Sequence, residues 1–253
     1  MCPNFGRFSN RRGELAADRS LVVRPTSLVL LRHGNSVANE GGCFGGWDDV
    51  SLAESGIAQA RQAGQQLQSL HLRFDLCFTS VLRRAIWTAW HCLDALDQLW
   101  IPTLPDWRLN ERHYGALQGM KKAQATSIFG PDQVRLWRRS FNERPPPLLP
   151  GDPRDSFGVP PYDGLSRSEV PLGESLQDTQ SRVLAYWHAK VLPALQQGQN
   201  VLVVAHGNSI RALLMELEHI SERDIAAVEV ANGVPIVLDR KTGTHHFTRR
   251  SSP

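Results

Sequence analysis

Two short apolar segments of this chain each lead into the same tetrapeptide, His-Gly-Asn-Ser. The first segment spans residues 27–31 and leads to His33, and the second spans residues 201–205 and leads to His206. Uniformly apolar runs of this length are typical of strands that are buried on both faces of a parallel sheet. Because the carboxyl ends of parallel strands meet at one edge, the repeat predicts two histidines that share one site.

Alternating strand and helix patterns predict an α/β fold, a three-layer sandwich in which helices flank a mostly parallel central sheet. Strands are expected at 27–31, 74–78, 201–205, 228–230 and 235–238. A capping-box pattern at 51–54 and helical spacing of apolar residues over 57–67 predict one helix, and further helices are expected at 82–99, 131–141, 174–197 and from about residue 209. Residues 102–122 are rich in turn-forming residues and are expected to be irregular.

The chain shows one clear change of character, near residue 26. Residues 1–26 are polar and broken by prolines and glycines, so we expect a flexible N-terminal extension there. No repeat or linker divides residues 27–253, which are expected to form a single domain. Residues 143–163 contain seven prolines, which excludes regular helix or sheet. This stretch is either a surface excursion or a lid, and our hypothesis is that it packs over the site entrance as part of a lid.

Composition argues against two classes of partner. The 28 lysines and arginines are nearly balanced by 25 acidic residues, which gives a formal net charge of +3. That balance does not predict the clustered basic face of a nucleic-acid-binding protein. The apolar runs are far shorter than the roughly 20 residues that a membrane-spanning helix needs. We therefore expect neither nucleic acid nor a membrane as partner.

Neither the cysteines nor the histidines form a metal-binding pattern. The four cysteines lie far apart without CxxC spacing, which fits a reduced, cytoplasmic protein rather than a zinc site or disulfide scaffold. His245 and His246 are adjacent on an extended segment, so their side chains are expected to point in opposite directions. No metal is expected.

Arginines supply positive charge close to the two histidines. Arg32 precedes His33 directly, and Arg84 follows the end of another expected strand. Guanidinium groups bind phosphate oxygens with two parallel hydrogen bonds and remain charged at any working pH. The glycine after each histidine allows a sharp turn, and the helix that follows favours an anion at its start. These residues predict a phosphate-binding pocket.

Four motifs together resemble the histidine phosphatase superfamily, and most closely its cofactor-dependent phosphoglycerate mutases. The similarity runs from about residue 27 to residue 240, and the stretch LNERHYGALQG at 109–119 is its longest specific part. The motifs are Leu31-Arg32-His33-Gly34, Thr79-Ser80 with Arg84, Asn110-Glu111-Arg112-His113-Tyr114-Gly115 and Ala205-His206-Gly207-Asn208-Ser209. The resemblance implies a phosphoglycerate mutase-like fold and a catalytic domain over residues 27–253.

The same resemblance implies roles for individual residues. His33 would be the nucleophile that becomes phosphohistidine, with Arg32, Arg84 and His206 around the phosphoryl group, and Glu111 would be the general acid and base. The substrate-binding residues would be Arg32, Asn39, Gly45, Gly46, Arg84, Glu111, Arg112, His113, Tyr114, Lys122, Arg138, Arg139, Gly207 and Asn208.

The activity implied by the resemblance is the interconversion of 3-phosphoglycerate and 2-phosphoglycerate in glycolysis and gluconeogenesis. The enzyme would be an isomerase primed by 2,3-bisphosphoglycerate, would act on small phosphorylated three-carbon acids, and would form a homodimer or homotetramer. This is the activity that we expect, because the substrate-holding stretch 110–122 and Arg138-Arg139 are intact.

Three departures from the mutase pattern favour other activities. Asn35 stands where that pattern has Glu, Cys43 stands where it has Arg, and the chain ends soon after Phe247. A shorter tail is expected to admit water, which competes for phosphohistidine. The alternatives are a phosphatase, or a bisphosphoglycerate mutase/phosphatase, on the same scaffold. A non-catalytic module that binds a phosphorylated ligand fits less well, because His33 and Glu111 are both present.

Overall fold

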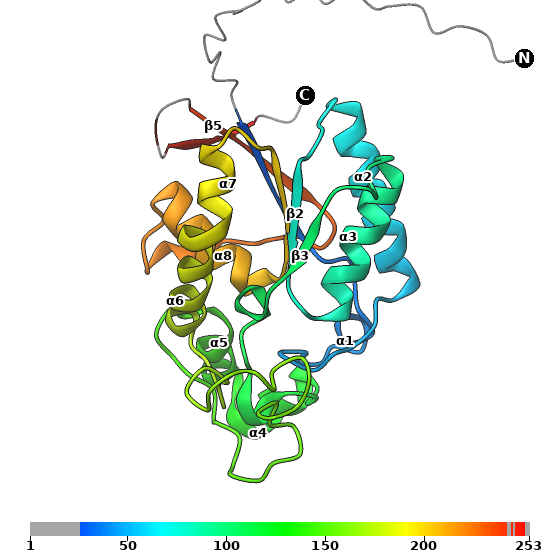
Figure 1. Ribbon diagram of the computed structural model, residues 1–253. Coiled ribbons are helices and arrows are strands. Elements are labelled where there is room, and N and C mark those ends of the chain that lie inside the picture. Colours follow the sequence, from blue (N-terminus) through cyan, green and yellow to red (C-terminus); the bar gives the residue numbers. More distant parts are fainter. Residues whose placement is uncertain (1–25, 242–243, 245, 251–253) are drawn as a thin grey trace, which may run out of the picture.

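A six-stranded sheet with the order β3-β2-β4-β1-β5-β6 forms the centre of the fold (Figure 1). The computed structural model describes residues 26–241, 244 and 246–250. Its strands are β1 (Thr26–Arg32), β2 (Leu76–Thr79), β3 (Thr103–Pro105), β4 (Val201–Ala205), β5 (Pro235–Arg240) and β6 (Phe247–Arg249). The neighbours from β3 to β1 pair in parallel, and the β1–β5 and β5–β6 pairs are antiparallel. The expected mostly parallel sheet is confirmed.

Helices cover both faces of this sheet, as the three-layer prediction requires. Figure 1 shows α2 and α3 on one side of the strands and α6, α7 and α8 on the other. The cause lies in the alternation along β1, where Leu28 and Leu30 pack in one apolar core and Val29 and Leu31 in a second. The helices are α1 (Val37–Glu40), α2 (Glu54–Ser69), α3 (Arg83–Ala95), α4 (Lys122–Phe129), α5 (Pro131–Arg139), α6 (Leu176–Tyr186), α7 (Leu192–Gln196) and α8 (Gly207–Glu218). Short 3-10 turns span Trp107–Leu109, Gly115–Leu117 and Asp224–Ala227.

Strand register places the two histidine loops side by side. Arg32 at the end of β1 pairs with Ala205 at the end of β4, and the amide of His33 donates to the carbonyl of Ala205 at 3.0 Å. His33 and His206 therefore leave neighbouring strands at the same level. This is the arrangement that the repeated tetrapeptide predicts.

The expected helix over 174–197 is interrupted. A π turn, Trp187–Val191, joins α6 to α7, and Pro193 lies in the first turn of α7. Proline has no amide proton to donate to the carbonyl one turn earlier, so the regular α-helical hydrogen-bond pattern cannot continue through it. The amphipathic pattern predicted the helical path and not this local change of pitch.

Two short strands were missed, and one expected strand is absent. Residues 228–230 form no strand; the carbonyl of Val230 instead accepts a hydrogen bond from Arg32. β3 lies within the stretch expected to be irregular, and β6 follows β5 at the opposite edge of the sheet. Each of these edge strands has only three residues, which is too short for apolar periodicity to indicate.

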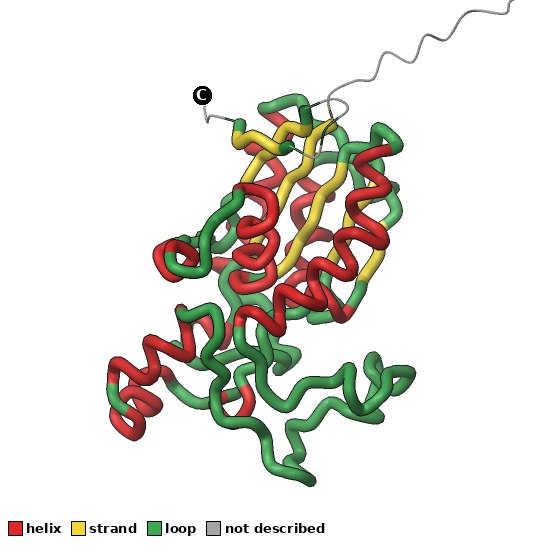
Figure 2. Tube along the Cα trace, turned by 90° about the vertical axis from the view of Figure 1, so that its left-hand side faces the viewer, coloured by secondary structure: helices red, strands yellow, loops and turns green. Residues whose placement is uncertain are grey.

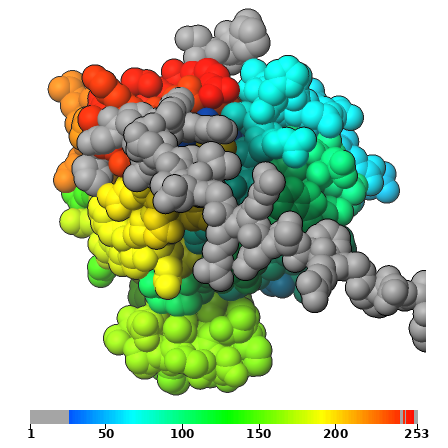
Figure 3. Space-filling model, turned by 45° about the horizontal axis from the view of Figure 1, so that its top comes forward, coloured from blue at the N-terminus to red at the C-terminus, as the bar shows by residue number. Residues whose placement is uncertain are grey.

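The proline-rich stretch has no helix or strand between α5 and α6 (Figure 2). In the space-filling view its neighbourhood forms a projection at one end of the molecule (Figure 3). The expected N-terminal extension lies outside the described residues except for Thr26, which begins β1, and His245 also lies outside them. Among the helices described, none has both the length and the apolar character to cross a bilayer.

Candidate active site

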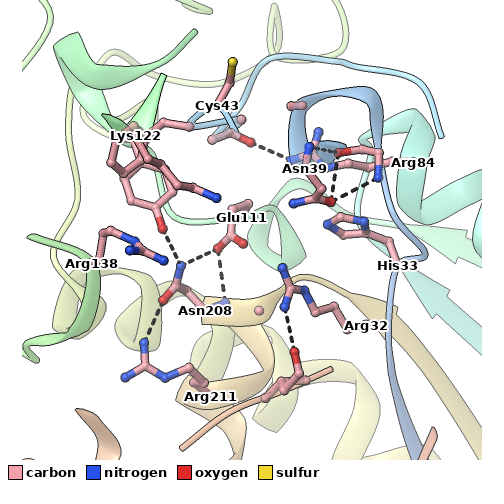
Figure 4. A pocket seen from close by; sticks show the side chains of 18 of the residues that line it. Arg32, His33, Asn39, Cys43, Arg84, Glu111, Lys122, Arg138, Asn208 and Arg211 are labelled. Atoms are coloured by element: carbon pink, nitrogen blue, oxygen red, sulfur yellow. Dashed lines mark hydrogen bonds between the residues drawn. The ribbon is translucent and has the colours of Figure 1, made fainter. Parts of the chain in front are cut away.

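A pocket with a volume of about 200 Å³ opens at the carboxyl ends of the parallel strands. Arg32 ends β1 and His33 follows it, Arg84 lies at the start of α3 after β2, and Asn208 lies at the start of α8 after β4 (Figure 4). The expected site residues that line it are Arg32, His33, Asn39, Gly45, Gly46, Arg84, Glu111, Tyr114, Lys122, Arg138, Arg139, Gly207 and Asn208.

The tautomer of His33 is determined by its own loop. Its Nδ1 lies 2.7 Å from the carbonyl oxygen of Gly34, which can only accept a hydrogen bond, so Nδ1 carries the proton. Burial lowers the pKa of His33 well below 6.5, and the positive charges of Arg84 and Arg32 lower it further. A neutral imidazole therefore presents an unprotonated Nε2, the form that can attack phosphorus.

The His33 loop is held by close packing against helix α2. A Cβ added to Gly34 would lie 2.2 Å from the carbonyl oxygen of Gly56, and one added to Gly56 would lie 2.0 Å from that of Asn35. The amide of Gly34 donates to the hydroxyl of Thr88 at 3.1 Å. The two glycines thus allow a backbone contact that any side chain would prevent.

His206 lies beside His33 and has a defined partner of its own. The ring centroids are 4.9 Å apart, and Nε2 of His206 is 2.7 Å from the hydroxyl of Ser80, which follows β2. Burial lowers the pKa of His206 well below 6.5, and the charge of Arg84 adds to this effect. Within the described residues Nδ1 of His206 is buried without a protein partner, and His206 itself does not line the pocket but lies directly behind His33.

Backbone carbonyls orient both arginines. Arg32 donates from Nη1 to the carbonyl of Val230 at 2.6 Å, and Arg84 donates from Nη2 to Gly46 at 2.7 Å and from Nη1 to Asp48 at 2.8 Å. Burial lowers the pKa of Arg84 to about 10, so this guanidinium is still charged at neutral pH. These hydrogen bonds go to backbone carbonyls and not to carboxylates, although the negative charges of Glu111, Asp49 and Asp48 act on Arg84 from nearby.

Glu111 faces the same space from the irregular segment after the first 3-10 turn. Its Oε1 accepts hydrogen bonds from the amide of Arg112 at 2.8 Å and from the side-chain amide of Asn208 at 2.9 Å. In the part of the chain that is described, no hydrogen bond reaches Oε2. Glu111 thus presents one carboxylate oxygen that can give or take a proton.

Four cations lie across the pocket from the two histidines. Lys122 begins α4, Arg138 and Arg139 end α5, and Arg211 projects from α8. Burial lowers the pKa of Lys122, and the charge of Arg138 lowers it further. Glu229, at the rim, is the acidic partner of Arg139. The pocket therefore has two regions of positive charge, one beside His33 and one on the opposite wall.

Arg211 was not among the residues expected in the site. Its Nη1 donates to the side-chain oxygen of Asn208 at 3.0 Å, and its Nη2 donates to the carbonyl of Ile225 at 2.6 Å. The first bond fixes which way the Asn208 amide points, and hence its donation to Glu111. A signal was present in the sequence, since Arg211 lies one helical turn after Gly207 and therefore on the same face.

A model of the histidine phosphatase superfamily, branch 1, matches residues 28–159 and 160–252. The chain belongs to the histidine phosphatase superfamily.

Three of the solved structures that share its fold are the following. A putative alpha-ribazole-5'-P phosphatase from Escherichia coli has a TM-score of 0.67 and 22% identity, and the alignment covers 90% of this chain and 95% of that one. The alpha-ribazole phosphatase from Shigella flexneri has a TM-score of 0.65 and 22% identity, with 89% and 95% covered. A mycobacterial glucosyl-3-phosphoglycerate phosphatase in complex with VO3 has a TM-score of 0.65 and 26% identity, with 89% and 96% covered.

These structures correct the activity expected of this chain. All three carry the names of phosphatases, so the expectation of a phosphoglycerate mutase and glycolytic isomerase is wrong. The motifs indicate a phosphate-binding pocket, and such a pocket by itself does not separate the two activities. The alternative of a phosphatase on this scaffold agrees better with the relatives.

Two of the expected substrate-binding residues do not line the pocket. Arg112 and His113 are both fully buried behind it. Arg112 donates to the carbonyl of Arg138 at 2.9 Å, and Nδ1 of His113 accepts from the amide of Gly115 at 3.0 Å. Burial lowers the pKa of His113 to about 3, which keeps the ring neutral. The side chains flanking Glu111 thus support the wall from which it projects.

The proline-rich stretch does not cover the entrance as expected. None of residues 143–163 lines the pocket. Tyr162 stacks on Trp47 with a centroid distance of 4.9 Å, and the Trp47 indole donates to the carbonyl of Glu111 at 2.7 Å. The stretch therefore packs behind the Glu111 segment. Two residues depart from the mutase pattern, Cys43 and Asn35. Cys43 lines the pocket. Asn35 does not line it, and its backbone amide donates to the side-chain oxygen of Gln59.

Proposed function

We propose that this protein is a phosphatase that hydrolyses phosphate monoesters through a phosphohistidine at His33. The observation that carries the proposal is the paired arrangement of His33 and His206, with ring centroids 4.9 Å apart, between Arg32 and Arg84. An unprotonated Nε2 beside fixed positive charge meets the two requirements of phosphoryl transfer, a positioned nucleophile and stabilised equatorial oxygens.

In the first step Nε2 of His33 attacks phosphorus, and the bond between phosphorus and the ester oxygen breaks. Glu111 donates its proton to that oxygen, so the alcohol leaves neutral. Arg32, Arg84 and Nδ1–H of His206 hold the phosphoryl oxygens. The leaving oxygen takes the Glu111 side of the pocket, because in-line transfer places it opposite His33.

In the second step a water molecule replaces the alcohol. Glu111, now a carboxylate, takes one proton from the water as its oxygen bonds to phosphorus. The bond between phosphorus and Nε2 breaks, inorganic phosphate leaves, and both side chains return to their starting states. The substrate itself loads His33, so this cycle requires no priming by 2,3-bisphosphoglycerate.

The substrate carries a second anionic group. Lys122, Arg138, Arg139 and Arg211 face the pocket, and Glu229 is the single acidic side chain lining that wall. This excess of positive charge suits a carboxylate or a second phosphate attached to the alcohol. The name of the mycobacterial relative, a glucosyl-3-phosphoglycerate phosphatase, describes an ester of this kind. Small phosphorylated acids therefore stay within the proposed substrate class.

The test is a phosphate-release assay with 3-phosphoglycerate, glucosyl-3-phosphoglycerate and p-nitrophenyl phosphate, with and without added 2,3-bisphosphoglycerate. We expect release that does not depend on the bisphosphate, and acid-labile phosphate labelling that His33→Ala abolishes. The proposal would be contradicted if none of the three esters released phosphate. It would also be contradicted if 2-phosphoglycerate formed faster than phosphate.

A further inference from the structure

A buried ion pair outside the pocket forms hydrogen bonds with the segment that carries Glu111. Arg182 of α6 and Glu174, two residues before that helix, have side chains that are only 8% and 4% exposed. Nε of Arg182 donates to Oε1 of Glu174 at 2.7 Å, and Nη2 donates to Oε2 at 2.8 Å. The pairing is a two-pronged contact between a planar guanidinium and a carboxylate, which fixes the orientation of both groups.

The remaining donors of Arg182 all go to one short stretch of backbone. Nη1 donates to the carbonyls of Arg108 at 2.8 Å and Asn110 at 2.9 Å, and Nη2 donates to the carbonyl of Glu111 at 2.9 Å. The same guanidinium lies over the Trp47 ring at 5.7 Å, and that ring also donates to the Glu111 carbonyl. Arg182 therefore holds the backbone up to and including the proposed acid.

Glu174 holds the chain on the other side of Glu111. Its Oε2 accepts from the amide of His113 at 2.7 Å, and its own amide donates to the carbonyl of His113 at 2.8 Å. Residues 110–114 have no helix or strand to fix their path. The ion pair thus contacts this irregular segment both before and after the residue whose carboxylate enters the pocket.

Stability alone is a poor reason to bury such a pair. Removing two charges from water carries a desolvation cost that often equals or exceeds their attraction, and well-packed apolar residues can replace them without loss. Apolar residues, however, could not supply hydrogen bonds of fixed direction to the carbonyl and amide groups around Glu111. The pair therefore fixes the geometry of the backbone around Glu111.

We propose that Arg182 and Glu174 are positioning residues for Glu111, which they hold at the distance from the leaving oxygen that proton donation requires. The inference rests on the proposed phosphatase reaction and adds a requirement to its first step. Displacement of a proton donor by even a fraction of an ångström weakens donation at the transition state.

The leaving group distinguishes positioning from general support. An alkyl oxygen is strongly basic and cannot depart without a proton, whereas p-nitrophenolate is a weak base that departs largely unaided. The value of kcat/KM covers the step in which the alcohol leaves. Misplacement of Glu111 should therefore slow an alkyl ester far more than an aryl ester, whereas general disturbance of the pocket should slow both alike.

The experiment compares kcat/KM for 3-phosphoglycerate and p-nitrophenyl phosphate in the full chain. Glu111→Gln sets the reference pattern, Arg182→Lys keeps the charge but loses the planar fork, and Glu174→Gln keeps the shape but loses the charge. Arg144→Lys is the matched control, because its ion pair with Asp178 involves the same helix at an exposed position. In each test variant we expect kcat/KM for the alkyl ester to fall about tenfold more than kcat/KM for the aryl ester, which is equivalent to about 1.4 kcal/mol at the transition state. The control should leave the ratio unchanged.

Equal losses on both esters, or no loss, in Arg182→Lys and Glu174→Gln would overturn the inference while leaving the proposed function intact. Failure of both variants to fold would also overturn it, because the pair would then serve stability. If the wild-type chain hydrolyses neither ester, the proposed function falls, and the inference falls with it.

Discussion

The imidazole rings of His33 and His206 lie 4.9 Å apart between centroids, with their planes inclined by 59°. His33 turns Nδ1 toward its own loop, and His206 turns Nε2 toward Ser80. Each ring therefore keeps one nitrogen for a ligand, and the two remaining nitrogens differ in function. Nε2 of His33 has a free lone pair that can attack a phosphoryl group, whereas Nδ1 of His206 can hold that group by a hydrogen bond in the tautomer in which the Ser80 hydroxyl donates to Nε2.

The Ser80 hydroxyl should determine the tautomer of His206. This hydroxyl accepts from the amide of Leu82 at 3.2 Å and lies 2.7 Å from Nε2, and we expect its own proton to go to that nitrogen, which would leave the His206 proton on Nδ1. Loss of one such hydrogen bond costs about 1–1.5 kcal/mol, so Ser80→Ala should lower kcat/KM about tenfold. Ser181→Ala, on the exposed side of α6, is the control for steady-state kinetics. An unchanged kcat/KM in Ser80→Ala would show that Ser80 does not govern the tautomer.

Burial of neutral histidines should make the protein less stable in mild acid. Burial lowers the pKa of His33 and His206 well below 6.5 and that of His113 to about 3. In the unfolded chain each takes up a proton near pH 6.5, so below that pH the unfolded state binds more protons than the folded one. The free energy of unfolding should then fall with decreasing pH, by up to about 1.4 kcal/mol per pH unit for each histidine.

Urea unfolding at pH 7.5 and pH 5.5 measures this dependence. His113→Gln should reduce the slope by about one proton, because it removes one of the three groups. Stability that stays constant or rises toward pH 5.5 would contradict the prediction.

The contact between the His33 loop and α2 should tolerate no side chain at Gly56. A Cβ there would lie 2.0 Å from the carbonyl oxygen of Asn35, so the loop would have to move. We expect Gly56→Ala to destabilise the fold by about 1–3 kcal/mol and to lower kcat as well. Gly164→Ala is the control, since nothing lies within 4 Å of its added Cβ. Thermal unfolding and phosphate release measure the two effects, and a Gly56→Ala protein that matches the control would refute the claim.

Lys122 should recognise the second anionic group and not the transferred phosphate. Lys122→Met should raise KM for 3-phosphoglycerate about tenfold, because one charge-assisted hydrogen bond is lost. KM for p-nitrophenyl phosphate should stay nearly unchanged. Lys121→Met is the matched control, because this neighbouring lysine is exposed and does not line the pocket. An equal effect of Lys122→Met on both esters would place Lys122 at the phosphoryl group instead.

The parts of the site that a sequence pattern could indicate are those at strand ends. His33, Arg84 and Asn208 each come after an apolar strand. Parallel pairing brings positions of this kind to one edge of the sheet, independently of the connecting segments. Arg112 and His113 belong to the same motif as Glu111, yet both are buried and neither lines the pocket. A motif gives the order of residues along an irregular segment, but the direction of each side chain depends on backbone angles that only packing determines. The expected dimer or tetramer stays a prediction.

The amino-acid sequence by itself determined the α/β fold, the superfamily and the strand-end residues that line the pocket, because apolar periodicity and strand-end motifs are local properties of the chain. Only the tertiary structure decided the support around them. Ser80 reaches His206 through the register of β2 and β4, and Arg182 grips Glu111 from a helix far along the chain. Contacts of this kind depend on how separate elements pack, and no spacing within either segment encodes them.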